Sequence, residues 1–337
     1  MGRLKAGIEG MGMKFPHKDI VLSLASFMAA AMAFGPARPT AAQLDIDRMA
    51  RELVPDTLGK NPADVGVYLD LTVQKLKEAL PALKGLKYEE NQDPLPSILA
   101  GVGKRIGDVL PHLPDLSAKE QIFHFQTQGD VVAHGGEGNL QPWSRDFRYL
   151  ILSQHNADGT TNVEELRTDT KGRPAQAPGQ FLAARGYGFT YQWLFFSPAN
   201  QSQFRFRYLG RQDRDGRKTR VIAFAQDPAK VPNPPYFQAL GKVAPFFYQG
   251  VLWVDESSFD IVRMRSDLLA PLSDLHLRQM TLELKFHTVP IKGSEVSYWL
   301  PVQEVIASDQ GAGGAEETHS FSDYQLYEGQ TKILPAK

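Results

Sequence analysis

From Gln121 onward, apolar and polar residues alternate with a period of two, the spacing of β-strands that bury one face. The clearest stretch is "MTLELKF", in which Met280, Leu282, Leu284 and Phe286 point one way and the polar residues between them are expected to face water. Similar segments, including "FTYQWLFF" from residue 189, recur as far as "THSFSDYQLY" near the C-terminus. Short turn sequences such as "NADGT", "RDGR" and "PIKGS" separate them, which favours antiparallel neighbours.

Before this alternation, apolar residues recur at helical spacing. The stretch "KNPADVGVYLDLTVQKLKEALPALK" predicts a helix with Asn61 as its N-cap and Pro62 at its first position. The stretch "PSILAGVGKRIGDVLPHL" predicts a second helix that stops at Pro111 and is weakened by three glycines. The tetrapeptide "SAKE", at 117–120, matches a capping box and predicts one more short turn. The sequence therefore predicts an α+β fold, with a helical block over 43–117 packed on a mostly antiparallel, curved β domain over 118–330.

The N-terminal segment has the pattern of an export signal. Lysines precede an apolar run, Ile20–Phe34, which is about as long as the core of a signal peptide and short for a membrane span. Small residues then lead to a cleavage site near Ala42, so residues 1–42 are expected to form a signal peptide. The mature chain would begin at Gln43 and reside in the periplasm or outside the cell. The alternative is an uncleaved anchor helix, and Met11 or Met13 could be the true start.

Composition excludes several classes of site. The chain of 337 residues contains no cysteine, so disulfides, thiolate metal sites, iron–sulfur clusters, cysteine nucleophiles and an N-terminal lipid-modified cysteine are all excluded. The formal net charge is −1, which gives no bulk attraction to nucleic acid. Aromatic residues make up 10% of the chain, as is typical of β structure.

A predicted hairpin near the middle of the β domain carries a resemblance to a known family. In "GVLWVDESSFDIVRMRSD", Asp255 begins a turn between an apolar strand and a strand whose Arg263 and Arg265 are expected on a cationic outer face. Together with "YLGRQDRDGRKTRVIAFAQ" before it and "YWLPVQEVI" after it, this order resembles periplasmic lipoprotein-carrier proteins of the LolA, LolB and RseB type. It also resembles uncharacterised exported bacterial proteins with the same succession.

The resemblance covers 204–327 and implies an open half-barrel, in which an antiparallel sheet holds acyl chains on a concave apolar face covered by helices. The helical segment here precedes the sheet as one block, which differs from the interspersed helices of that family.

Aromatic residues supply the candidate ligand site. In the predicted strands they share faces, and the hairpin adds a tryptophan and a methionine, so the candidate cavity lining is Phe189, Tyr191, Trp193, Phe195, Phe204, Phe206, Tyr208, Trp253 and Met264. The Pro-rich segment 231–247 is apolar for a linker and is expected to form a cover loop through Tyr236, Phe237, Leu240 and Phe246. The alternative for the whole set is a filled sheet core, and the sequence leaves both open.

Other patterns predict no chemistry. The arginines from Arg205 to Arg220 are expected to form a solvated strand face, with contact to anionic lipid as an alternative. The histidines are scattered without ligand spacing, and His134, beside glycines and a glutamate, is expected to lie in a plain loop. Serine-nucleophile, Walker and EF-hand patterns are missing from the sequence. We therefore expect no metal, no cofactor and no catalytic residues.

These observations favour an exported, non-enzymatic protein that binds a lipid or acylated chain. Two other hypotheses stay open: a cell-envelope module that binds a partner protein, and a hydrolase with an unrecognised site. An exposed apolar patch on the helices would favour the module, and a polar cleft in place of an apolar one would favour the hydrolase. The oligomeric state is not predicted.

Overall fold

The computed structural model describes residues 21–23, 66–128, 142–155, 161–173, 188–239, 242–309 and 313–327. The helices are α2 (Val73–Ala79), α3 (Leu95–Val109) and α4 (Phe189–Leu194), with short 3-10 turns beside them. None of the helices within these ranges is long and apolar enough to cross a bilayer.

Most of the described chain is β-strand. The strands are β1 (Val21–Ser23), β2 (Lys87–Tyr88), β3 (Leu116–Gln128), β4 (Trp143–His155), β5 (Thr161–Thr168), β6 (Phe204–Arg214), β7 (Arg217–Gln226), β8 (Tyr236–Ala239), β9 (Lys242–Pro245), β10 (Tyr248–Asp255), β11 (Ile261–Leu268), β12 (Gln279–Pro290), β13 (Ser297–Asp309) and β14 (Gly313–Leu326).

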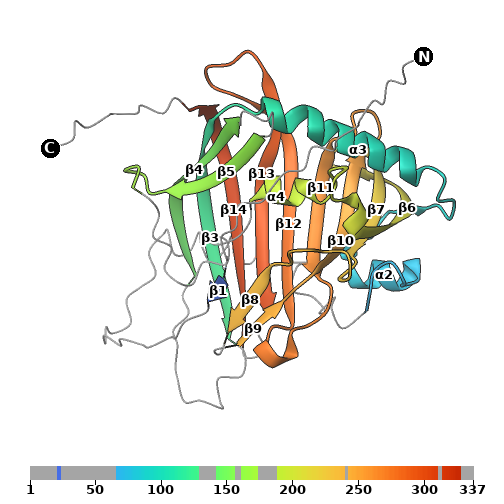
Figure 1. The fold of residues 1–337 in the computed structure, drawn as a ribbon. Helices are drawn as coiled ribbons and strands as arrows, with labels where there is room; N and C mark the ends of the chain where they lie inside the picture. The colour runs from blue at the N-terminus through green and yellow to red at the C-terminus, as the bar shows by residue number, and fades with distance from the viewer. Residues whose placement is uncertain are drawn as a thin grey trace, which may run out of the picture.

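Among the described residues, eleven strands form one curved sheet in the order β2-β6-β7-β10-β11-β12-β13-β14-β3-β4-β5 (Figure 1). Every neighbouring pair in it is antiparallel, as the short connections predict. β2 and β5 lie at opposite edges, so the sheet is not closed. The mostly antiparallel α+β fold with a curved, open sheet is confirmed.

The two faces of this sheet are covered by different parts of the chain. We call the face that carries α3 and α4 the inner face; there the Ser266 hydroxyl donates to Oε1 of Gln192 in α4. The opposite, outer face is covered by residues that precede α3, and the Tyr68 hydroxyl donates to Asp267. In Figure 1, α3 runs across one end of the sheet while α4 lies against its face.

Polar side chains predicted to face water are buried on the outer face. Thr281 and Glu283, between the apolar residues of "MTLELKF", are 0% and 6% exposed. Arg265 is 4% exposed and forms an ion pair with Asp267, so the expected cationic outer face was wrong at this strand. The N-terminal segment covers this surface, and that long-range contact is not encoded in the alternation.

The arginine-rich strand β6 also binds the N-terminal segment. Arg207 donates to the carbonyl oxygens of Leu69 and Leu71, at 3.2 and 2.7 Å. Arg211 forms ion pairs with Glu89 and Glu256. These arginines are therefore not only solvated, because they hold the segment before α3 on the sheet.

Two helix predictions need correction. The first predicted helix begins later than expected, since α2 has Thr72 as its N-cap, whereas Asn61 and Pro62 lie outside the described residues. The predicted turn at 117–120 is wrong, because these residues belong to β3. The second predicted helix is confirmed as α3, although its end continues through Pro111 as a 3-10 turn.

The predicted strand at 189–196 is wrong, because its first six residues form α4. Gly188 is the N-cap, and the helix ends three residues before Ser197, which precedes a proline that disfavours helical geometry in the residue before it. Helices therefore do not all precede the sheet, since α4 lies between β5 and β6.

The expected cover loop contains a small hairpin. β8 and β9 pair antiparallel, and β1 pairs parallel with β8, so these three strands form a second sheet. β1 lies inside the segment predicted to be an export signal. Phe237 and Phe246 are buried, Tyr236 is 45% exposed, and Leu240 lies outside the described residues.

Candidate binding site on the inner face

The aromatic residues of α4 pack in pairs set by helical spacing. Phe189 contacts Trp193 with ring centroids 5.0 Å apart, and Tyr191 contacts Phe195 at 5.2 Å. Positions 189, 191, 193 and 195 alternate as in a strand, but they also form two i, i+4 pairs, which lie one turn apart on α4 and its C-cap Phe195. The pattern fits both a β-strand and an α-helix, and the prediction of a strand was wrong.

These rings fill the inner face. Trp193 stacks on Phe286 of β12 at 5.5 Å. Phe204 and Phe206 of β6 share this face, as predicted, and contact Phe196 at 6.5 and 6.1 Å. The aromatic residues expected to line a cavity therefore form a packed core in this part of the sheet.

The two hairpin residues in the predicted lining do not share a face. Trp253 is opposite Arg263, whereas Met264 is opposite Leu252, and neighbouring positions on a strand point to opposite faces. Met264 is on the inner face. Trp253 is on the outer face, where its indole N–H donates to Gln212 at 2.8 Å. Tyr208 of β6 is fully buried, and its hydroxyl is 3.3 Å from Glu89.

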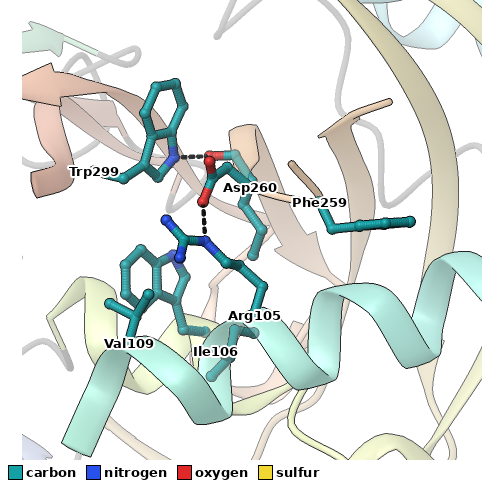
Figure 2. A pocket seen from close by; sticks show the side chains of 8 residues that line it. Arg105, Ile106, Val109, Phe259, Asp260 and Trp299 are labelled. Carbon is teal, nitrogen blue, oxygen red and sulfur yellow. Dashed lines mark hydrogen bonds and ion pairs between the residues drawn. The ribbon is translucent and has the colours of Figure 1, made fainter. Parts of the chain in front are cut away.

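A small cavity lies where α3 meets α4 and the ends of β11 and β13 (Figure 2). We call it the α3–α4 corner; its lining residues are Arg105, Ile106, Val109, Trp193, Phe259, Asp260, Ile261 and Trp299. Its volume is about 10 Å³, room for roughly one water molecule.

The polar groups of this corner differ in their partners. Arg105 of α3 and Asp260 form an ion pair at 2.6 Å, and the Trp299 indole donates to the Ile261 carbonyl oxygen at 2.7 Å (Figure 2). The Trp193 indole N–H, by contrast, has no acceptor within the described chain although the residue is only 4% exposed. A buried donor without an acceptor costs about 1–3 kcal/mol, so this N–H marks the corner as a place where an acceptor could bind.

The other half of the inner face carries buried charges. On β14 and β3, His319 Nδ1 lies 2.7 Å from Glu120, and His124 Nδ1 lies 3.1 Å from Glu317. Arg167 of β5 donates to both oxygens of Glu120 at 2.9 and 2.8 Å. We call these five residues, with Glu304 and Glu165, the inner-face ion cluster.

Burial and pairing shift the pKa values in this cluster in opposite directions. Burial alone would lower the pKa of His319, but hydrogen bonds to Glu120 and Glu317 outweigh it and raise the pKa to about 9. Burial alone would raise the pKa of Glu317, yet hydrogen bonds from His124 and His319 lower it to about 2. The cluster therefore contains an imidazolium held between carboxylates near neutral pH.

Glu165 is the member that contacts α4. Its Oε1 accepts from the Thr190 backbone N–H at 3.0 Å and from the Thr190 hydroxyl, and its Oε2 accepts from the Tyr149 hydroxyl. Removal from water raises the pKa of Glu165 to about 7, although the Thr190 hydrogen bonds oppose this shift. Burial also raises the pKa of Glu304.

Sequence reasoning missed this cluster. His124 and His319 looked scattered because they are 195 positions apart, and only the strand register puts Glu317 opposite His124 and His319 opposite Glu304. No group of histidines and carboxylates with metal-binding geometry occurs in the ranges that the structure describes. His134 lies outside those ranges.

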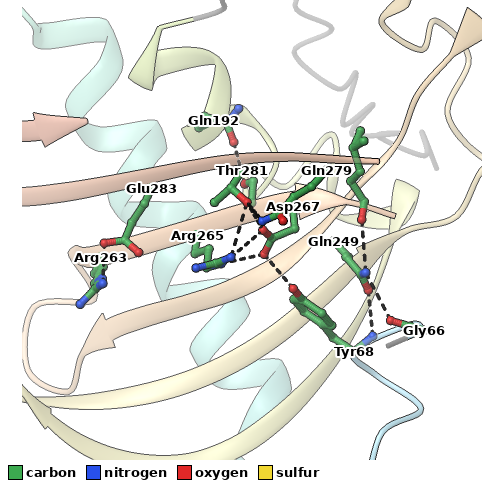
Figure 3. Close-up of polar contacts among 12 residues, drawn as sticks. Gly66, Tyr68, Gln192, Gln249, Arg263, Arg265, Asp267, Gln279, Thr281 and Glu283 are labelled. Carbon is green, nitrogen blue, oxygen red and sulfur yellow. Dashed lines mark hydrogen bonds and ion pairs between the residues drawn. The ribbon is translucent and has the colours of Figure 1, made fainter. Parts of the chain in front are cut away.

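A second buried polar cluster lies on the outer face (Figure 3). Asp267 accepts from both Arg265 and Tyr68, with distances of 2.8 Å to each, and the Thr281 hydroxyl donates to it at 2.5 Å. Gln249 accepts from the Tyr68 backbone N–H at 2.8 Å. These polar groups bind one another by hydrogen bonds. The cluster therefore attaches the N-terminal segment to the sheet, and it does not have the character of a ligand site.

Comparison with known proteins gives remote matches in structure. No family model and no curated protein matches the sequence. A DUF1329 family protein from Desulfovibrio piger matches with a TM-score of 0.38 and 11% identity, over 71% of this chain and 95% of that one. A domain named for outer membrane lipoprotein sorting, from Vibrio parahaemolyticus, has a TM-score of 0.34 and 12% identity, over 70% and 94%.

Lipoprotein LppX from Mycobacterium tuberculosis matches with a TM-score of 0.24 and 12% identity, over 70% of this chain and 99% of that one. All these similarities concern the fold alone. They are remote, and they assign no family and no role to this chain.

Proposed function

We propose that this protein is an exported, non-enzymatic protein of the cell envelope that binds a lipid or an acylated chain on the inner face of its sheet. The α3–α4 corner is the part of that face where the ligand binds. Ile106, Val109 and Trp299 supply apolar surface there, and burial of an acyl chain on such surface is favourable by about 25 cal/mol per Å².

The observation that carries the proposal is the Trp193 indole N–H. The Trp193 side chain is buried and lines the corner, and its N–H has no acceptor among the described residues. A carboxylate or ester oxygen at the head of an acyl chain is an acceptor that fits beside it. Arg105, whose side chain is 41% exposed, adds a cation at the same place.

Binding requires the corner to open, because about 10 Å³ does not hold an acyl chain. Two groups of contacts keep it closed: the ion pair between Arg105 and Asp260, and the stacking of Trp193 on Phe286. The first joins α3 to the turn before β11, and the second joins α4 to β12. Movement of either helix would connect the corner to the rest of the inner face.

The charged residues of the inner face argue against an enzyme. Glu120, Glu317 and His319 are each 0% exposed, and His319 forms an ion pair with each of the two glutamates. A substrate would have to displace these contacts before it met an acid or a base. Their arrangement suits a fixed electrostatic framework beside a binding site.

The test begins with the ligand that the protein carries. The full chain, purified from the envelope fraction of the expressing cells, is measured by native mass spectrometry, and the same sample is extracted with organic solvent. A lipid or acylated molecule at about one per chain, released on denaturation, is the expected result. A bare protein mass with no lipid in the extract would contradict the proposal.

The Trp193→Phe variant then tests the site, because it removes the N–H and keeps an aromatic ring. We expect its affinity for the fluorescent fatty acid cis-parinaric acid to fall by roughly tenfold, the equivalent of one hydrogen bond of about 1.4 kcal/mol. Trp143→Phe, on β4 away from the corner, is the matched control and should bind like the wild type. Equal loss in both variants would refute a specific role for Trp193.

Exposed apolar side chains on the hairpin of β8 and β9 favour the alternative, a module that binds a partner protein. Tyr236 of β8 and Val243 of β9 are 45% and 53% exposed. In the described part of the helical region, Tyr88 is the only large apolar side chain that is exposed, so the apolar patch expected for such a module on the helices is not found there. Co-purification of a stoichiometric envelope protein, lost on Tyr236→Ser, would favour this function over ligand binding.

A further inference from the structure

We infer that Glu165 is a proton-dependent latch that holds α4 on the inner face and thereby regulates access to the α3–α4 corner. The inference rests on the proposed function, because α4 carries Trp193, which lines that corner. Its geometric basis is the position of one carboxyl group between the last strand of the sheet and the first turn of α4.

Glu165 joins three elements of the fold. It lies on β5, it accepts from the Tyr149 hydroxyl on β4, and it accepts twice from Thr190 at the start of α4. The fit is close, because a Cβ added at Gly188, the N-cap of α4, would lie 1.5 Å from the Glu165 carboxylate. The start of α4 is therefore attached to the sheet through this carboxyl group.

The charges around Glu165 act on its ionisation in opposite directions, because Arg167 favours the carboxylate and Glu304 disfavours it. Arg167, its neighbour on the same face of β5, directs its guanidinium at Glu120 of β3 and also forms an ion pair with Glu304 of β13 at 3.7 Å. Glu304 interacts electrostatically with Glu165 and disfavours a negative charge there, and His319 of β14 is bound to Glu120. Tyr324 of β14 also interacts electrostatically with Glu165. Removal of the carboxyl group from water has the largest effect on Glu165, and this burial raises its pKa.

Protonation and docking of α4 are consequently linked. The pKa of Glu165 is about 7 with α4 docked, against 4.5 for a solvated glutamate, because docking removes the carboxyl group from water. The docked state therefore binds the proton more tightly, and docking weakens as the pH rises from 4.5 to about 7. The difference of 2.5 pH units corresponds to a change of up to roughly 300-fold in the docking equilibrium.

The experiment measures α4 without any ligand. Hydrogen–deuterium exchange is followed from pH 5 to pH 8 on the full chain, and the protection of 189–196 is expressed relative to that of β12 in the same sample. We expect the relative protection of α4 to fall by at least tenfold between pH 5 and pH 7.5 in the wild type, and to stay constant in Glu165→Gln. Glu164→Gln changes the exposed neighbour on β5 and should behave like the wild type.

A second variant covers the case in which Glu165→Gln does not fold. Thr190→Val removes one donor that favours the ionised carboxylate, so the midpoint of the transition should move to higher pH. An unchanged pH dependence in Glu165→Gln, an unmoved midpoint in Thr190→Val, or constant protection in the wild type would each overturn the latch. A failure of lipid binding would leave this measurement intact, so the two proposals can fail separately.

Discussion

At the scale of single residues, the outer-face cluster shows how much the fold depends on buried charge. Arg265 and Asp267 are 4% and 1% exposed, and together they bind Tyr68 and Thr281 (Figure 3). Burial alone would lower the pKa of Arg265, but the adjacent carboxylate of Asp267 outweighs it and raises the pKa above its ordinary value. Arg265 and Asp267 compensate each other's charge. If either were removed, the other would remain as a buried charge without a counter-charge.

Asp267→Asn should therefore lower the free energy of unfolding by about 3–5 kcal/mol, because it leaves the Arg265 guanidinium buried without its counter-charge. Urea denaturation followed by tryptophan fluorescence measures the change. Arg211→Ala, which breaks ion pairs of a side chain that is 57% exposed, should cost much less, because water and salt screen a surface ion pair. A similar small loss in both variants would show that the Arg265 pair contributes no more than a surface pair.

At the scale of elements, α3 contains glycines with different roles. A Cβ at Gly101 would lie 2.4 Å from the Phe259 ring, whereas a Cβ at Gly107 would meet nothing within 4 Å. Gly101 thus allows α3 to approach the turn before β11, the same turn that supplies Asp260 to the α3–α4 corner. The sequence predicted a weak helix from these glycines, but only the packing distinguishes them.

Alanine at the two positions should have opposite effects. Gly107→Ala is expected to raise the free energy of unfolding by about 0.5–1 kcal/mol through helix propensity. Gly101→Ala gains the same propensity but displaces Phe259, so we expect a net loss of about 1–3 kcal/mol. Thermal and urea unfolding of both variants decide this, and a stabilised Gly101→Ala would show that α3 does not depend on this close approach.

The elements also show which predictions the sequence could support. Strand alternation predicted the sheet, because it is a local pattern and the connections are short. It could not predict that the polar face of β11 and β12 is buried, because Tyr68, which binds Asp267 of β11 there, is 199 positions away in the chain. It also could not separate the two periods at Phe189 and Trp193, which fit a strand and a helix equally. The inner-face ion cluster depends on strand register, and so no single segment contains its signal.

At the scale of the whole molecule, the inner face of the sheet has two halves with different side chains. The half from β6 to β12 is packed with aromatic rings around α4, and the half from β13 to β5 holds the inner-face ion cluster. Glu165 connects the halves through Thr190. A change in protonation on one side can therefore alter packing on the other, which is the arrangement expected of a binding site that opens and closes.

The pH dependence of global stability follows from the same cluster. Glu317, with a pKa of about 2, contributes stability that is present above pH 4.5 and is lost as the pH falls toward 2. His319, with a pKa of about 9, contributes stability that is present below pH 6.5 and is lost as the pH rises to 9. Protonated Glu165 adds a loss between pH 4.5 and about 7. The free energy of unfolding should thus be greatest near pH 5.

Urea denaturation at intervals from pH 3 to pH 10 measures this profile. His319 alone should contribute on the order of 3 kcal/mol to the loss between pH 6.5 and 9, since 2.5 pKa units separate folded from unfolded His319. His319→Gln should flatten the profile between pH 6.5 and 9, whereas Glu165→Gln should flatten only the part between pH 4.5 and 7. A wild-type free energy of unfolding that stays constant from pH 5 to pH 9 would mean that the cluster does not keep His319 protonated. It would then contradict the claim that this half of the inner face is held together by buried ion pairs.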